Sequence, residues 1–149
     1  MAEKKHAKLS ASGASRWMAC PGSVAMETGH VETGDMTFAI EGTAAHFLAD
    51  LILSQPVVLA APQTAADYLG QYILDDSITH HRGDAAVRIT HEMVVAVQRY
   101  VDYVQALPGE FHPEQLVDFS EWVPGGFGTA DSIILNGSHL SIVDLKYGV

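Results

Sequence analysis

The chain has 149 residues, 48% of them hydrophobic, and its 18 Asp and Glu against 8 Lys and Arg give a formal charge of −10 at pH 7. This length supports one core and argues against two ordinary domains, so we expect a single domain over residues 1–149. The negative charge argues against a protein that coats nucleic acid, and it leaves any nucleic-acid site to a local arrangement of charge.

Helical patterns fill the chain from about residue 10 to residue 107. Ser10 or Ser12 can cap a short helix in "ASRWMAC", and we expect a longer helix from Thr43 onward in "MTFAIEGTAAHFLADLILS", because Gly42 weakens its first half. "QTAADYLGQYILDD" is typical of a short helix and "SITHHRGDAAV" of a loop. The strongest pattern is "THEMVVAVQRYVDYVQAL", which Thr90 caps and whose apolar stripe consists of Met93, Val94, Val97, Tyr100, Val101 and Val104.

From Gln115 the pattern changes to three β-type runs, "QLVDFSEWV", "GTADSIIL" and "HLSIVDLKY", which turn residues separate. They predict an antiparallel three-stranded meander at about residues 115–148. Together with the preceding patterns this indicates an α+β fold, in which N-terminal helices pack on a small antiparallel sheet.

The Asn136-Gly137 pair predicts a hairpin that brings two acids together. If these two residues form the loop, Asp131 lies diagonal to Asp144, whereas in a four-residue loop "NGSH" the two acids stand opposite each other. Both registers place the two carboxylates and Lys146 on one face of the sheet. We expect that face to meet the core through its apolar residues Ile133, Leu135, Leu140 and Ile142.

Two acids and a lysine on such a face need partners, because an unpaired buried charge costs several kcal/mol. A Mg²⁺ or Mn²⁺ ion on Asp131 and Asp144 would satisfy the acids, while Lys146 could orient water or stabilise charge that develops on a phosphate. That chemistry is phosphodiester hydrolysis. A structural salt bridge between Lys146 and one of the acids is the alternative that the spacing leaves open.

Segments at both ends of the chain carry a family resemblance: "LSASGASRWMACPGSVAME", "EGTAAHFLAD", and "FGTAD" followed by "VDLKYG", in that order. They resemble segments of RecB-like nucleases of the PD-(D/E)XK superfamily, in particular a family found in phages and prophages. The resemblance implies that His46, Asp131 and Asp144 are metal ligands and that Lys146 is the catalytic lysine. Glu41 is a further candidate ligand, although it lies about 140° around a helix from His46.

Two features depart from this family. Cys20 is the only cysteine, whereas the related nucleases that hold an iron–sulfur cluster use four, so we expect no such cluster in one chain and expect Cys20 to be a small buried residue. The superfamily core also continues after its Asp-x-Lys motif with a helix and a strand, while here the motif ends three residues before Val149. The fold would then be an N-terminal part of that core, with an open sheet edge that a second copy or another chain could cover.

Two functions follow from these observations. The first is a metal-dependent DNA nuclease of phage or prophage origin, whose activity as this short chain is in question. The second is a non-catalytic phage-encoded protein with a truncated nuclease fold, which binds and inhibits a host defence protein in the manner of an anti-CRISPR protein. Retention of the motifs favours the first, while charge favours the second, because only Lys146 lies near the site and Arg82, Arg88 and Arg99 belong to the middle of the chain.

The remaining expectations concern location and the two tryptophans. No apolar run follows the basic start, and no run reaches the roughly 20 residues that cross a bilayer, so we expect a cytoplasmic protein without membrane contact. If the chain is phage-encoded, as the resemblance implies, this is the cytoplasm of the host cell. Trp17 and Trp122 lie amid apolar neighbours, and we expect both to pack in the core.

Overall fold

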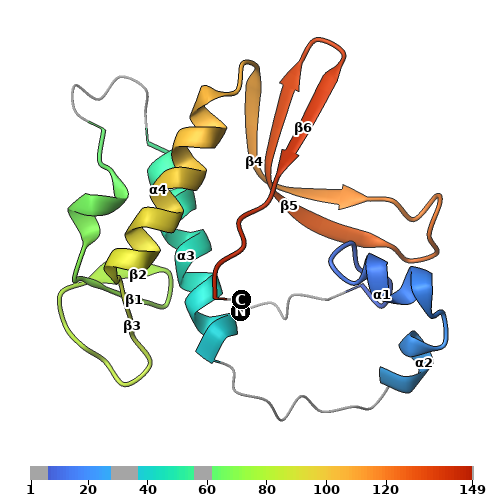
Figure 1. The fold of residues 1–149 in the computed structure, drawn as a ribbon, viewed down its shortest axis with the longest axis horizontal. Coiled ribbons are helices and arrows are strands. Elements are labelled where there is room, and N and C mark those ends of the chain that lie inside the picture. Colours follow the sequence, from blue (N-terminus) through green and yellow to red (C-terminus); the bar gives the residue numbers. More distant parts are fainter. Residues whose placement is uncertain (1–6, 28–36, 56–61, 149) are drawn as a thin grey trace.

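A computed structural model describes residues 7–27, 37–55 and 62–148 (Figure 1). Its helices precede a C-terminal antiparallel meander, which confirms the α+β class. The elements in chain order are α1 (Ala14–Ala19), α2 (Ser23–Glu27), α3 (Thr37–Leu53), the 3-10 helix η1 (Ala65–Tyr68), β1 (Tyr72–Leu74), β2 (Ser77–Thr79), β3 (Val87–Arg88), α4 (His91–Ala106), β4 (Glu110–Asp118), β5 (Phe127–Asn136) and β6 (His139–Val143).

Helices α3 and α4 pack side by side and supply most of the core (Figure 1). The Thr90 hydroxyl caps α4 by accepting a hydrogen bond from the Met93 N–H at 3.2 Å, and all six residues of the predicted apolar stripe are buried. Helix α3 begins at Thr37, six residues before the predicted start. Gly42 fits inside it because the Tyr147 carbonyl passes 3.3 Å from the position of a Cβ atom, so close packing outweighs the helix penalty of about 1 kcal/mol for glycine.

A second antiparallel sheet, of order β2-β1-β3, stands where the sequence predicts a short helix and a loop. Only Ala65–Tyr68 is helical there. The two-residue loop between β1 and β2 consists of Asp75 and Asp76, with φ of 47° and 54°. Two left-handed residues form the turn that matches the twist of a hairpin, and Asp tolerates this conformation better than most residues. The helix prediction is wrong here because that turn outweighs the helical spacing of the apolar residues.

The C-terminal sheet has the order β4-β5-β6, and its hairpin follows one of the two predicted registers. Leu135 pairs with Leu140 and Asn136 with His139, so the same register sets Asp131 opposite Asp144. Regular pairing ends one residue earlier, at Ser132 and Val143. On the other side of β5, the pairing of β4 skips the row that contains Asp131, where Glu114 has a φ of +44°.

The prediction of which face of this sheet meets the core is wrong. Ala130, Ser132 and Ile134 are buried, and Ile134 belongs to the core that the helices form, whereas the exposed fractions of Leu135, Leu140 and Ile142 are 42%, 59% and 58%. The buried Ser132 is held by α4, because the Tyr100 hydroxyl of that helix hydrogen-bonds the Ser132 hydroxyl at 2.6 Å. Figure 1 shows that β4 and β5 change direction midway along their length.

The N-terminal segment also differs from expectation. The N-cap of α1 is Gly13 and not a serine, and no residue of α1 is buried. Cys20, which follows this helix directly, is therefore exposed and not part of a core. Trp17 is only partly buried, and Trp122 is 75% exposed. None of the helices in the described ranges is long and apolar enough to cross a membrane.

Candidate functional site

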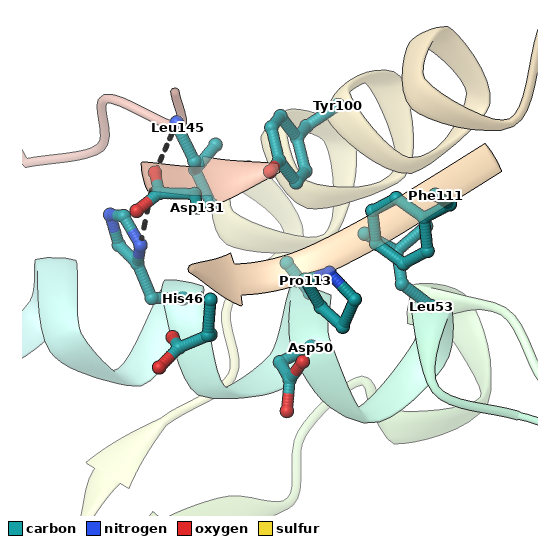
Figure 2. Close-up of a pocket in the computed structure, with 10 residues that line it drawn as sticks. His46, Asp50, Leu53, Tyr100, Phe111, Pro113, Asp131 and Leu145 are labelled. Carbon is teal, nitrogen blue, oxygen red and sulfur yellow. Dashed lines mark hydrogen bonds and ion pairs between the residues drawn. The ribbon is translucent and has the colours of Figure 1, made fainter. Parts of the chain in front are cut away.

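His46 of α3 and Asp131 of β5 meet at the side of the C-terminal sheet (Figure 2). The distance between His46 Nδ1 and Asp131 Oδ2 is 3.4 Å, and the two side chains are 32% and 17% exposed. The same Oδ2 atom accepts a hydrogen bond from the backbone N–H of Leu145 at 2.8 Å. One carboxylate thus joins the helix, the central strand and the segment that follows β6.

The charges of this pair support each other. The hydrogen bond with Asp131 raises the pKa of His46, while burial lowers it by a smaller amount. Burial would raise the pKa of Asp131, but the hydrogen bonds from His46 and from the Leu145 N–H outweigh burial and lower this pKa. The geometry therefore favours an imidazolium beside a carboxylate, with the proton of the imidazolium neutralising the acid.

Asp144 and Lys146 form a second pair next to the first. The Lys146 ammonium contacts Asp144 Oδ2, and both side chains are largely exposed. Leu145, between them in the chain, is buried, because its side chain packs into the core that α3 and α4 share. Successive side chains in extended chain point to opposite sides, so a buried Leu145 directs its two neighbours outward. The salt bridge that the spacing left open is therefore present.

The two pairs line adjoining cavities. His46 and Asp131 line a cavity of about 450 Å³, and Asp144 and Lys146 line one of about 590 Å³. Thr129 of β5 lines both cavities. The two pairs also interact electrostatically, since the charge of Asp144 contributes to the raised pKa of His46 and the charge of Lys146 to the lowered pKa of Asp131. All four residues that the resemblance selects thus lie at one part of the sheet.

The candidate ligands are of types that divalent cations accept, but their positions in the structure do not form a closed metal site. Two carboxylates and an imidazole are ligands that Mn²⁺ accepts, and the carboxylates suit Mg²⁺. Within residues 7–27, 37–55 and 62–148, however, no three His, Cys, Asp or Glu side chains gather closely enough to hold a metal ion. The structure joins His46 to Asp131, while Asp144 is held by Lys146. Glu41 lines neither cavity.

Sequence reasoning missed Glu114, the residue that stands opposite Asp131 in the register of β4 and β5. Its side chain lines the same cavity as His46 and Asp131. Its left-handed backbone is uncommon for a residue other than glycine, and such conformations concentrate at functional sites. Pro113 directly before Glu114 is a turn residue and is the one signal that could have indicated this conformation, although Glu is not a residue that usually follows it with positive φ.

Comparison with known proteins adds a family. A family model described as "Protein of unknown function (DUF2800)" matches residues 6–149. No solved structure matches this chain.

Proposed function

The chain belongs to this DUF2800 family, and we propose that it is a metal-dependent nuclease that hydrolyses phosphodiester bonds in DNA, acting in the cytoplasm of a host cell. The observation that carries the proposal is the meeting of His46 with Asp131, which come from a helix and a strand 85 positions apart in the sequence. The same two residues are those that the resemblance to RecB-like nucleases selects. Asp144 and Lys146, the other two, line the adjoining cavity.

Each of these residues has a role in the proposed reaction. Asp131 and His46 would hold a Mg²⁺ or Mn²⁺ ion together with Asp144. When bound, such an ion polarises a phosphodiester and makes a bound water more acidic. The Lys146 ammonium, which is exposed at the rim, neutralises charge on the phosphate. Asp131 also positions the other groups, because its Oδ2 atom fixes both the imidazole and the Leu145 backbone.

A second candidate is the non-catalytic binding protein, and two observations favour it. The described residues contain no three-ligand group, and three apolar side chains stand exposed on the outer face of the C-terminal sheet. An exposed apolar patch of this kind is typical of protein contacts. The partner in this case would be a host defence protein, and the four motif residues would remain as a structural charge cluster.

A cleavage assay separates the two candidates. End-labelled single- and double-stranded DNA is incubated with the protein and either Mg²⁺ or Mn²⁺. We expect cleavage by the native chain, loss of cleavage in Asp131→Asn, and a decrease of about 10²–10³-fold in Lys146→Ala, as for removal of one preorganised charge. The matched control is Asp84→Asn, since Asp84 is an exposed acid of the β2–β3 connection, outside both cavities.

Metal binding is measured on the same variants by calorimetry with Mn²⁺. Weaker binding in Asp131→Asn than in Asp84→Asn supports the site. Cleavage that survives both Asp131→Asn and Lys146→Ala would contradict it. A cooperatively folded native chain that neither binds Mn²⁺ nor cleaves DNA would favour the binding protein.

A further inference from the structure

Positive charge gathers at the N-terminus of this acidic chain. The first 16 residues contain Lys4, Lys5, Lys8 and Arg16 against one Glu, a net charge of +3 in a chain whose total is −10. Lys8 and Arg16 belong to the described residues, and both are exposed. Arg16 is neutralised by Glu27, which it contacts at 2.8 and 2.9 Å, whereas Lys8 makes no ion pair with another described residue. Lys8 is therefore a free cation of this segment.

The fold docks this segment on the C-terminal sheet. Ala11 packs against β5 at Gly128, where an added Cβ atom would lie 3.5 Å from the Ala11 Cβ. The turn before α1 is held by two hydrogen bonds to Ser10, whose backbone carbonyl accepts from the Trp17 indole at 2.9 Å and whose hydroxyl accepts from the Gly13 N–H at 3.2 Å. Figure 1 shows α1 and the turn before it beside the bent part of β4 and β5.

The cavity of about 590 Å³ lies between this segment and the sheet. Its polar lining includes hydroxyls of Ser10, Ser12 and Thr129 and the ammonium of Lys146, all of which can donate hydrogen bonds to phosphate oxygens. Leu116 and Phe127 add apolar surface that suits a sugar or a base. Asp144 also lines the cavity and neutralises Lys146. Lys8 does not itself line the cavity, but it follows Ala7, which does, and it is exposed and forms no ion pair with another described residue.

We propose that residues 7–12, together with Thr129 and Lys146, bind the phosphodiester backbone of a nucleic-acid strand and lead it to His46 and Asp131. The path is continuous because Thr129 lines both this cavity and the one that contains His46. The destination of the strand rests on the proposed nuclease function, whereas binding of the strand does not require cleavage. The docked segment adds Lys8, which follows the cavity-lining Ala7 in the chain, to the positive charge of Lys146.

The test measures binding without chemistry. A fluorescein-labelled single-stranded DNA oligonucleotide is titrated with the protein in EDTA, and anisotropy is followed over a range of salt concentrations; an RNA oligonucleotide of the same sequence distinguishes the two backbones. Each phosphate contact contributes about 0.7 to the salt slope for a single strand, which corresponds to about fivefold in affinity near 0.1 M salt. We expect Lys8→Ala to weaken DNA binding about fivefold and to lower the slope by about 0.7.

Arg82→Ala is the matched control, because Arg82 is an exposed cation of the β2–β3 connection, on the far side of α3 and α4 from α1 (Figure 1). Unchanged affinity in this control supports a local groove, and an equal loss in both variants would overturn it in favour of a diffuse charge effect. Absence of binding by the native chain, or equal competition by polyglutamate of matched charge, would also overturn it. If the Lys8→Ala and Arg82→Ala variants cleave DNA equally well, the proposed groove is refuted but the nuclease function is not. If the native chain binds the oligonucleotide but shows no metal-dependent cleavage, the nuclease function is refuted but the groove is not.

Discussion

Removal of the Tyr100 hydroxyl tests how the site is attached to the core. Tyr100 is 7% exposed and Ser132 is fully buried, and their hydroxyl oxygens lie 2.6 Å apart. This bond links α4 to β5 at the residue next to Asp131. Burial raises the pKa of Tyr100, so its phenol keeps the proton at neutral pH. Tyr100→Phe leaves the Ser132 hydroxyl buried without its partner, which costs about 1–3 kcal/mol.

The loss of stability in each single variant depends on which of the two hydroxyls remains without its partner. Ser132→Ala removes the other half of the pair, and the Tyr100 residue that remains borders a cavity of about 10 Å³ beside His46, about the space that one water molecule needs (Figure 2). We therefore expect about 1 kcal/mol for Ser132→Ala. The double variant loses both polar groups at once, so it should be destabilised by about 1 kcal/mol less than the sum of the single variants.

Urea denaturation followed by circular dichroism gives the free energy of unfolding for each variant, after coincident transitions by fluorescence establish two-state behaviour. Tyr103→Phe is the control, because Tyr103 lies on the same helix, is 59% exposed, and should change the stability by less than about 0.5 kcal/mol. Additive single and double variants, or a Tyr100→Phe effect no larger than that of Tyr103→Phe, would refute the bond as a structural link.

Two further predictions concern charge and backbone. In EDTA, the stabilising His46–Asp131 pair should be fully formed below the ordinary His pKa of 6.5 and above the ordinary Asp pKa of 3.8. It is lost as pH rises through the raised pKa of His46 or falls through the lowered pKa of Asp131. The stability difference between the native chain and His46→Gln, measured in urea from acid to alkaline pH, should therefore be largest between these values; a difference independent of pH contradicts the ion pair. Gly109→Ala should destabilise by about 3 kcal/mol or more, because φ is +139° and the added Cβ would lie 2.4 Å from the Leu135 carbonyl oxygen. Gly70→Ala, with φ of +82° and no atom within 4 Å, isolates the cost of the backbone alone, about 1–2 kcal/mol, so equal thermal shifts in the two variants would contradict the clash.

The sequence predicted the hairpin register but not the face that it buries. Asn136-Gly137 localised the turn, and Leu135 pairs with Leu140 as in one of the two alternatives. The alternation of side chains along a strand left open which of the two faces of the hairpin is buried, and the larger apolar side chains on one face led to the wrong prediction. The choice depends on Tyr100, which offers a hydroxyl to Ser132 and makes burial of that small polar residue possible. Such a partner lies 32 positions away and leaves no local pattern.

The candidate site was also predicted only in part from the sequence. Spacing placed Asp131 and Asp144 in one row of the sheet, and the resemblance, not the spacing, selected His46. The contact of His46 with Asp131 requires α3 to bring His46 next to Asp131 of β5, and the position of α3 depends on the packing of the whole core. Glu114 and Lys8 were missed for different reasons. Pro113 before Glu114 permits a turn, but glutamate is not a residue that such a turn favours, and Lys8 belongs to a segment that docks on β5 through Ala11, a contact between distant parts of the chain.

Leu145 decides how the four motif residues can act together. Its buried side chain turns Asp144 and Lys146 outward, and its N–H occupies the same Asp131 oxygen that contacts His46. For Asp144 to join His46 and Asp131 around one ion, this short segment has to rotate and Lys146 has to exchange its partner. A strand of nucleic acid supplies that exchange, because a phosphate can take the ammonium from Asp144 and free the carboxylate for a metal. Substrate and metal binding would then be coupled, and Mn²⁺ affinity measured with and without a non-cleavable oligonucleotide should rise with the oligonucleotide present. Equal Mn²⁺ affinities in the two conditions would show that Leu145 keeps the pairs apart in every state.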